Sequence, residues 1–414
     1  MKNCPLLSKG LFIACGLFLS QLTVSNSLFA QTKKEIILKN NSDKLVKDYT
    51  LEIPVEKLGL SVGSYNAKFN NAIVPVEIIH DTYGKQKAVI PICGIKGKED
   101  LKVSIEQGSS ETYPKRTYAE LSHKIGGELV NNKYVAENFS WVKVNKMTLP
   151  GSFRDHAYYI KYEGPGWESD KVAFRFYLDN RNAIDVFGKT TSDIVLPAVG
   201  VDGYDNYHKY APWGMDNMKV GKALGIGTIA IWDGEKAVRV EERDSTTCII
   251  QADGKVRSQV KTIYHGWNAN GTKCNLTSLI SIDAGSRASH MELLTDKKID
   301  NIATGIVKIK NAELITQNDK NSEWSYIATF GKQSLNNDMQ GLAIFVRTKQ
   351  LKEITEDALN HVVVLNPENN YTEYYFMPTW ELDKEPVKTK EQFMACIEEV
   401  MNRLNNNINI TVKK

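Results

Sequence analysis

Short runs of alternating apolar and polar residues fill most of the chain. Because successive side chains of an extended strand point to opposite faces, this two-residue period predicts strands rather than helices. Within residues 33–110 the runs are separated by turn signals such as the Asp-Thr-Tyr-Gly at 81–84, which predicts a small N-terminal β-sandwich. From 118 to 414 such runs continue with few interruptions, which predicts one large β-supersandwich.

One helical pattern stands out near the C-terminus. Thr389 and Gln392 have the spacing of a capping box, and apolar residues then recur at helical spacing from Phe393 to Leu404. The sequence therefore predicts an all-β fold, with a small N-terminal β-sandwich followed by a large β-supersandwich and one C-terminal helix.

Residues 1–30 are typical of a secretory signal peptide. Lys2 and Lys9 precede an apolar run that starts at Leu11, and Ala30 is a small residue suited to cleavage. The apolar run before Cys15 is too short for a lipoprotein signal, and no later segment is long and apolar enough to cross a bilayer. We therefore expect a periplasmic protein with no membrane insertion after the signal is removed.

The charge balance is close to neutral, with 52 basic and 49 acidic residues and no basic stripe, which argues against a nucleic-acid partner. The cysteines outside the leader, Cys93, Cys248, Cys274 and Cys396, match no zinc spacing. A disulfide between Cys248 and Cys274 stays open for an oxidising compartment. We expect no cofactor, and only scattered side chains leave a divalent metal open.

Residues 171–181, KVAFRFYLDNR, carry the most informative alternation. On an extended strand, one face would be apolar and the other would present a cation, a phenol, a carboxylate and a second cation. The polar face would consist of Arg175, Tyr177, Asp179 and Arg181. This chemistry suits an acidic or hydroxyl-rich ligand, although a solvated face with cross-strand ion pairs would have the same pattern.

Further candidates flank this segment. His156 follows an aspartate in the preceding strand, and a Gly-Pro-Gly turn places Trp167 at an expected loop tip, where its flat face could cover a sugar ring. A long irregular stretch, residues 200–219, contains Trp213, Asp216 and Lys219. Irregular loops of this length inside a compact domain are usually functional.

Two later strands also place histidines beside charged groups. Alternation puts His265 and Trp267 on one strand face together with Arg257, and His290 with Glu292 on another. A histidine taken alone is more often structural than catalytic. The sequence has no His-x-His, HExxH, GxSxG or P-loop pattern, so no metal site is indicated.

The segments FRDHAYYIKYEGPGWESDKVAFRFYLDNRNAIDVFGK and APWGMDNMKVGKALGIGTIAIW resemble the DUF4861 family of exported Bacteroidetes proteins, and the resemblance runs from about Ile36 to the C-terminus. It implies an association with hydrolases of unsaturated uronic-acid sugars in loci that degrade pectin-like or ulvan-like polysaccharides. The Gly-Met-Asp-x-x-Lys-x-Gly run is similar to galactose-mutarotase-like supersandwich proteins, whose active sites use His and carboxylate residues on a concave sheet. No assured catalytic set comes with the family.

Our first hypothesis is a periplasmic carbohydrate-active enzyme that acts on acidic, uronate-containing oligosaccharides by elimination or dehydration. Arg175 or Arg181 would hold the uronate carboxylate while the neighbouring proton leaves. The base and the acid would come from Tyr177, His156 or His265.

Other reactions and roles stay open. Hydrolysis needs two carboxylates, which Asp179 with Asp216 or Glu292 would supply. The second hypothesis is a mutarotase or epimerase, which would use a histidine as the acid and a carboxylate as the base.

The third hypothesis is a non-catalytic sugar-binding protein. Trp167, Trp213 and Trp267 would stack on the ligand. Asp216 and Lys219, together with the charged strand face, would fix its orientation.

Overall fold

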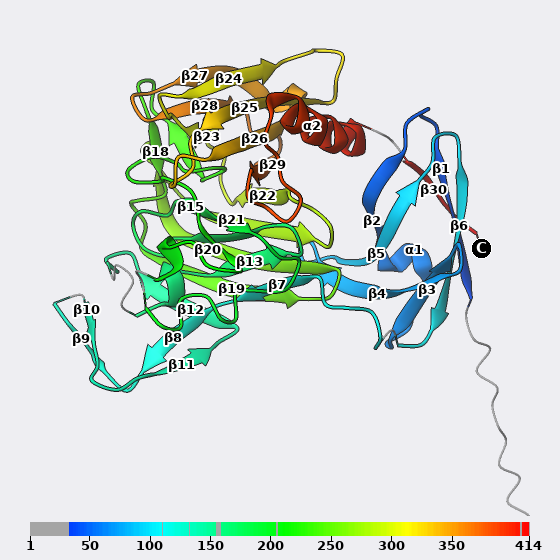
Figure 1. Ribbon diagram of the computed structural model, residues 1–414, viewed down its shortest axis with the longest axis horizontal. Helices are drawn as coiled ribbons and strands as arrows, with labels where there is room; N and C mark the ends of the chain where they lie inside the picture. The colour runs from blue at the N-terminus through cyan, green and yellow to red at the C-terminus, as the bar shows by residue number, and fades with distance from the viewer. Residues whose placement is uncertain are drawn as a thin grey trace, which may run out of the picture.

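The computed structural model describes residues 33–109, 111–131, 133–154, 159–203, 206–405 and 408–413. It confirms the expected all-β fold with one long C-terminal helix. A small sandwich lies beside a larger body of strands, and helix α2 (Lys390–Asn405) lies on the side of the large body that faces the small sandwich (Figure 1). Within these ranges no helix has the length and apolar character needed to span a membrane.

The N-terminal sandwich is one seven-stranded antiparallel sheet that folds over on itself. Strand β4 pairs with β3 through its first half and with β5 through its second half, so the chain passes from one layer to the other within β4. Apolar residues such as Ile36, Leu51 and Val103 fill the space between the layers. In sheet order the strands are β2 (Val46–Pro54), β5 (Gln86–Ile95), β4 (Ala72–His80), β3 (Tyr65–Phe69), β6 (Asp100–Gln107), β1 (Lys34–Asn40) and β30 (Ile408–Val412); helix α1 (Val55–Leu58) follows β2.

The end of the chain returns to its beginning. Strand β30 pairs antiparallel with β1, with Ile36 opposite Val412. The last strand of the expected second domain therefore forms an edge of the N-terminal sheet, and the chain crosses between the two bodies twice.

The large body is a supersandwich of a nine-stranded sheet and two five-stranded sheets. The nine-stranded sheet runs β12 (Lys146–Pro150), β19 (Ser245–Asp253), β20 (Arg257–Ala269), β21 (Thr272–Asp283), β22 (Ser289–Thr295), β29 (Tyr371–Trp380), β26 (Met339–Arg347), β25 (Trp324–Lys332) and β24 (Ala312–Gln317). One five-stranded sheet contains β16 (Gly214–Asp216), β15 (Ile184–Lys189), β14 (Ala173–Phe176), β13 (Gly166–Ser169) and β7 (Thr117–Glu120). The other contains β18 (Ala237–Arg239), β17 (Ala230–Trp232), β23 (Ile302–Val307), β28 (Asn360–Leu365) and β27 (Leu351–Glu356).

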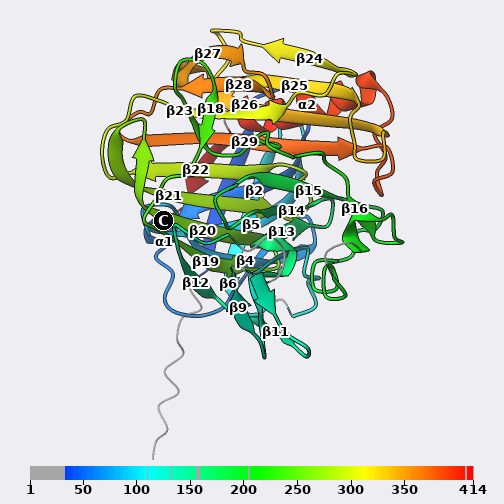
Figure 2. The ribbon, with the colours of Figure 1, turned by 90° about the vertical axis from the view of Figure 1, so that its left-hand side faces the viewer.

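The main core lies between the nine-stranded sheet and the two smaller sheets. Phe174 on β14, Ile306 on β23 and Phe376 on β29 belong to one buried cluster, which shows that all three sheets share it. Two short strand pairs project from this body (Figures 1 and 2). They are β9 (Glu128–Val130) with β10 (Lys133–Val135), and β8 (Ser122–Ile125) with β11 (Ser140–Lys143).

The opposite face of the nine-stranded sheet looks toward the N-terminal sandwich, and we call it the cleft face. Strand alternation produces it directly, because Met291 and Leu293 point into the core while His290 and Glu292 point the other way. Helix α2 covers one part of this face with an apolar cluster that includes Phe345 on β26. The remainder stays open between the sheet and the sandwich.

The sequence signal for α2 is confirmed by the bonds at its start. The amide of Gln392 donates to Thr389 Oγ1 at 3.3 Å, and the amide of Thr389 donates to Gln392 Oε1 at 3.3 Å. This reciprocal pair satisfies two amides that have no partner inside the helix. Phe393, Ile397 and Val400 then form the buried face of the helix.

Candidate functional site

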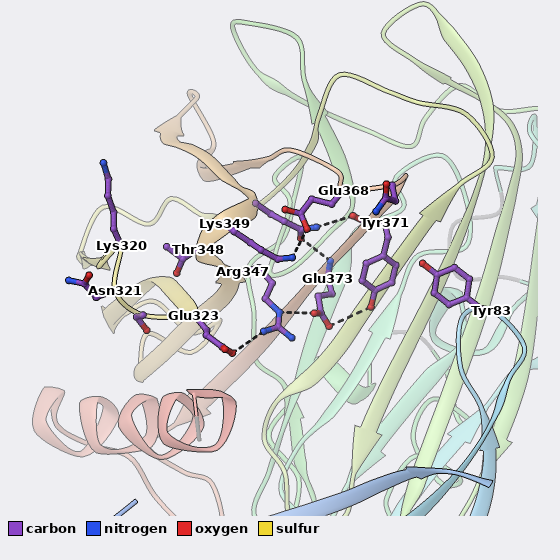
Figure 3. A pocket seen from close by; sticks show the side chains of 13 residues that line it. Tyr83, Lys320, Asn321, Glu323, Arg347, Thr348, Lys349, Glu368, Tyr371 and Glu373 are labelled. Carbon is purple, nitrogen blue, oxygen red and sulfur yellow. Dashed lines mark hydrogen bonds and ion pairs between the residues drawn. The ribbon is translucent and has the colours of Figure 1, made fainter. Parts of the chain in front are cut away.

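A cavity of about 930 Å³ lies mainly over the segments of the large body that join β24 to β25, β26 to β27 and β28 to β29, and the N-terminal sandwich borders it through Tyr83. Its walls include Tyr83 from the sandwich and Arg347, Lys349, Tyr371 and Glu373 from the large body (Figure 3). This volume is within the range of small-molecule and oligosaccharide sites.

Two smaller cavities, about 240 and 210 Å³, adjoin it and reach toward the sandwich. His290 and Tyr375 line both of them, and Glu373 lines the larger cavity as well as one of the smaller ones. The pair formed by His290 and Glu373 therefore stands where the three spaces meet.

His290 is held in a defined orientation. Its Nε2 lies 2.9 Å from Glu373 Oε2, and its ring stacks on Tyr375 with centroids 4.1 Å apart and planes 4° from parallel. Burial alone lowers the pKa of His290, but the Glu373 hydrogen bond and the charge of Glu292 outweigh it and raise that pKa. The imidazole is therefore held toward its protonated form beside an open cavity.

Two glutamates face each other across neighbouring strands at the same point. Glu292 on β22 is the direct register partner of Glu373 on β29. The Tyr371 hydroxyl lies 3.1 Å from Glu292 Oε1 and 3.5 Å from Glu373 Oε2. Like charges directly opposite in a sheet are destabilising, so this arrangement is better explained by chemistry than by stability.

Glu373, Tyr371 and His290 have different protonation states because their surroundings shift their pKa values in different ways. Burial raises the pKa of Glu373, but His290 and Arg347 more than compensate and bring it to about 2. Burial, with the charges of Glu292 and Glu373, raises the pKa of Tyr371 well above its usual value. The cluster thus combines a fixed carboxylate, a neutral phenol and an imidazole that favours its charged form.

Cations line the cavity beside this cluster. Arg347 Nε donates to Glu373 Oε1 at 2.7 Å, and Arg347 Nη1 lies 3.3 Å from Glu323 Oε2. Lys349 Nζ lies 2.5 Å from Glu368 in a solvent-exposed pair. Exposed ion pairs contribute little stability, so the pairs to Glu323 and Glu368 can be exchanged for a ligand carboxylate at small cost.

The N-terminal sandwich forms the opposite wall through charged contacts. Arg257 on β20 binds Asp283 at 2.5 Å and Glu52 of the sandwich at 2.7 Å. Burial raises the pKa of Glu52, but Arg257 and Lys87 reverse the effect and lower it to about 2. Glu52 and Arg257 on this wall are therefore ionised near neutral pH.

The strand expected at 171–181 is shorter than predicted, and neither of its faces is open to solvent. Strand β14 covers only Ala173–Phe176, and all four of its residues are buried. The alternation is real, but the polar side lies under a second apolar cluster that includes Val195 and Tyr207 from the irregular stretch after β15. Sequence alternation cannot reveal such a cover, because it comes from residues distant in the chain.

Arg175 is the centre of a closed ionic network. It is 1% exposed, and its guanidinium donates to Glu163 at 2.9 Å, Asp185 at 2.8 Å and Asp216 at 2.5 Å. The Tyr207 hydroxyl is a further acceptor at 2.9 Å. Its Nη1 and Nη2 groups face protein partners, and its buried Nε has no hydrogen-bond partner among the residues that the structure describes. The burial of the whole side chain fits a structural role.

Other expected site residues join the same network. Tyr177 donates to Asp185 Oδ2 at 2.6 Å, and Arg181 pairs with Asp179 at 2.7 Å and with Glu163 at 2.7 Å. The structure thus brings Arg175, Tyr177, Asp179, Arg181 and Asp216 together in one network, although only Arg175 of these lies in β14. His156 lies outside the described residues.

The tryptophans do not form an exposed platform. Trp167 lies in β13 rather than at a loop tip, is 1% exposed, and donates to Ser289 Oγ at 2.9 Å. Trp267 is equally buried in the main core, and Trp213 is half-buried against Phe187 with ring centroids 6.0 Å apart. The expected exposure of Trp167 is therefore wrong, because the ring packs on the nine-stranded sheet.

The remaining candidates are scattered. His265 lies on β20, eight residues and thus roughly 26 Å along the strand from Arg257, and its Nε2 contacts Thr247 Oγ1 at 3.3 Å. Lys219 is exposed in the loop after β16. Neither residue lines the three cavities of the cleft.

The cysteines that the sequence left open as a disulfide are not joined. Cys248 and Cys274 are both buried and free. They occupy different registers, since Cys248 lies opposite Thr262 and Cys274 opposite Trp267. Among the residues that the structure describes, no group of three or more potential ligands is placed to hold a metal.

Sequence reasoning singled out His290 and Glu292 but missed their partners. Glu373 and Tyr371 share one face of β29, where alternation with Thr372 and Tyr374 was readable in the sequence. Arg347 and Tyr83 carried no such signal, because their place at the cleft depends on strand pairing and on the position of the sandwich.

Fold and site together define an all-β protein with a polar cleft between a small sandwich and a supersandwich, and with an acid–base cluster at its centre. The chain belongs to the family described as Domain of unknown function (DUF4861), whose model matches residues 38–410. This confirms the family resemblance seen in the sequence.

The comparisons with individual proteins are more distant. "Uncharacterized protein P7" of Formosa agariphila is 27% identical over 271 residues, which are 60% of this chain and 66% of that protein, slightly under two thirds of its length. Two solved structures from Enterococcus faecalis, a protein in the Glycosyl Hydrolase Family 38 and an alpha-mannosidase, match at 8% identity with TM-scores of 0.45 and 0.44. They match 93% and 92% of this chain, which spans about half of their length (48% and 46%). At these values they support no functional argument.

Proposed function

We propose that this protein is a carbohydrate-active enzyme that binds uronate-containing oligosaccharides in the cleft and transfers protons on the sugar ring, by elimination or dehydration. The observation that carries the proposal is the cluster of His290, Glu292, Tyr371 and Glu373 at the junction of three cavities. General acid–base chemistry needs such groups in different protonation states, within hydrogen-bond reach of a substrate.

The roles follow from charge and position. Glu292 is the base that removes the proton next to the uronate carboxylate. The electron pair of that C–H bond forms a carbon–carbon double bond as the β C–O bond breaks, and protonated His290 supplies a proton to the leaving oxygen. Tyr371 donates a hydrogen bond to the developing charge, while Arg347 and Lys349 bind the carboxylate.

These assignments keep the substrate class and reaction suggested by the sequence but move the chemistry away from β14. Support for the move comes from burial, because Arg175 is closed in by its own partners whereas the cleft cluster borders open cavities. The leader-like residues 1–30 favour a periplasmic location.

A second candidate is an epimerase or mutarotase acting at the same site. It is favoured by the juxtaposition of one protonated imidazole and one carboxylate. An epimerase would use this pair to remove and return the proton of one carbon, and a mutarotase would use it to protonate the ring oxygen and deprotonate the anomeric hydroxyl. Both reactions begin with proton removal, so the products distinguish them.

The test is product analysis of the protein without residues 1–30, incubated with lyase-released oligosaccharides from pectin and ulvan in D₂O. A product that is one water lighter supports dehydration, and shorter fragments support chain cleavage. Deuterium incorporation without either change supports epimerisation. No change in mass and no deuterium uptake with any substrate would overturn elimination, dehydration and epimerisation, and an unchanged rate of anomer interconversion would overturn the mutarotase as well.

A further inference from the structure

Tyr83 is an aromatic side chain of the N-terminal sandwich that stands at the edge of the 930 Å³ cavity (Figure 3). It lies on the loop between β4 and β5 and is 57% exposed. Its ring lies beside that of Tyr371, with centroids 6.0 Å apart and planes 27° from parallel. An aromatic face is thus available to a ligand at the boundary between the two bodies.

The loop that carries Tyr83 is rigidly built. Asp81 Oδ1 accepts the amides of Tyr83 at 3.0 Å and Lys85 at 2.9 Å, and the amide of Gly84 donates to the carbonyl of Asp81 at 2.9 Å. Gly84 has a φ of +78°, a conformation that glycine adopts without steric cost. The backbone that presents the ring is therefore held in one conformation, which lowers the entropy lost on binding.

The sandwich itself is fixed against the nine-stranded sheet next to this loop. The Glu77 carboxylate accepts three consecutive amides, those of Lys255, Val256 and Arg257, at 2.5, 3.1 and 3.1 Å. Gln251 Nε2 donates to the carbonyl of His80 at 2.9 Å. Strand β4 is therefore hydrogen-bonded to the nine-stranded sheet close to Tyr83. These bonds hold the Tyr83 loop in place relative to the acid–base cluster on the same sheet.

Tyr83 contacts the acid–base cluster through Tyr371, whose ring lies beside its own. Tyr371, its neighbour, donates to Glu292 at 3.1 Å. A sugar ring that covers Tyr83 would therefore belong to the residue next to the one that reacts. The two cavities that His290 lines, about 240 and 210 Å³, are much smaller than the 930 Å³ cavity that Tyr83 borders.

We infer that Tyr83 is a sugar-stacking platform, through which the N-terminal sandwich binds the ring adjacent to the reacting one and selects longer oligosaccharides over shorter ones. The phenol face covers the C–H side of a pyranose, and the cations of the cleft bind the substituents. The inference rests on the proposed function, since it deepens the substrate class of that site. It gives the small sandwich a direct part in recognition.

The experiment measures affinity by calorimetry for galacturonic acid, its dimer and its trimer, and for neutral sugars of the same three lengths. The variants are Tyr83→Ala, Tyr83→Trp and Tyr210→Ala. Tyr210 is the matched control, because it is also 57% exposed but does not line the cleft. Denaturation midpoints of all variants verify folding.

We expect Tyr83→Ala to weaken binding of the dimer and the trimer about tenfold, the size of one good aromatic contact, and to leave binding of the single sugar, which has no adjacent ring, little changed. Tyr83→Trp should retain affinity, and Tyr210→Ala should bind every sugar with the affinity of the wild-type protein. Equal affinities in Tyr83→Ala and Tyr210→Ala would overturn the inference.

The neutral sugars separate this inference from the proposed function. A Tyr83-dependent affinity for a neutral chain would support the platform and contradict uronate specificity. Tyr83-dependent binding with no turnover would support the platform and contradict the enzyme. Absence of binding to every sugar tested would overturn the platform.

Discussion

Glu292 and Glu373 lie directly opposite each other on the neighbouring strands β22 and β29, with the Tyr371 hydroxyl within 3.1 and 3.5 Å of their carboxylates. One hydroxyl proton cannot satisfy two carboxylates at once. Glu373 has two cationic partners at salt-bridge distance, His290 and Arg347, whereas Glu292 has none among the residues that the structure describes. Glu292 is therefore the carboxylate most available to a substrate proton.

Replacing Glu292 by Gln should reduce kcat/KM on acidic oligosaccharides by about 10²- to 10⁴-fold, the range of one general acid–base group. The free energy of unfolding should stay equal or rise, because the substitution removes a like-charge pair. Steady-state kinetics and urea unfolding measure the two effects.

Glu353→Gln is a matched control for that variant, since Glu353 is exposed on β27 away from the cleft. It should leave both quantities unchanged. Full activity in Glu292→Gln would exclude Glu292 as the base.

The ion pair of His290 and Glu373 should make stability depend on pH in a defined window. The pKa of His290 is raised in the folded protein, so its contribution is complete below its ordinary value of 6.5 and is lost as pH rises through the folded value. The pKa of Glu373 is lowered from 4.5 to about 2, so its contribution is complete above 4.5 and is lost as pH falls toward 2.

Urea unfolding of His290→Gln and of the wild-type protein, measured from about pH 2 to above pH 6.5, tests whether the ion pair contributes stability in this window. The difference in unfolding free energy should be largest between 4.5 and 6.5 and shrink on either side. A difference that is constant with pH would show that the pair does not titrate as described.

Arg175→Ala should destabilise the fold by about 3–5 kcal/mol, because it leaves buried carboxylates without their cation. Burial and the neighbouring Asp185 already raise the pKa of Asp216 well above its usual value, which shows how costly charge is at this position. The hypothesis that Arg175 holds a uronate carboxylate predicts instead that the same substitution abolishes activity without unfolding the protein.

Arg181→Ala serves as the comparison, because its side chain is 23% exposed and water can replace part of its contacts. It should lose less stability than Arg175→Ala in chemical denaturation. A stable, inactive Arg175→Ala variant would return the chemistry to β14.

Glu77→Ala should loosen the sandwich from the nine-stranded sheet. It leaves three amides without their acceptor, and hydrogen bonds to a charged group are worth about 1.5–3 kcal/mol each. We expect a lower unfolding midpoint together with weaker oligosaccharide binding, because Tyr83 then loses its fixed place. Unchanged affinity in a destabilised variant would contradict the role of the sandwich as a wall.

The strand pattern of this sequence was sufficient to predict the fold class and two residues of the candidate site, His290 and Glu292. Period-two alternation revealed β22, and with it His290 and Glu292 on one face. It could not reveal that Glu373 stands opposite Glu292, because β22 and β29 pair across a long stretch of intervening chain. Nor could it place Tyr83, whose position at the cleft depends on contacts between the sandwich and the nine-stranded sheet, such as those of Glu77 and His80.

The same limit explains the prominence of Arg175 in the sequence. Its alternating strand has the pattern of a polar surface, and an open and a covered polar face have identical alternation. Only the packing of Val195 and Tyr207 shows that this face is closed.

A crystal structure of Glu292→Gln with a bound oligogalacturonide would test the location of the site most directly. We expect the sugar to lie between Tyr83 and His290, with a carboxylate at Arg347 or Lys349. A sugar bound elsewhere, for example over β14 and Arg181, would contradict the assignment of the cleft as the functional site.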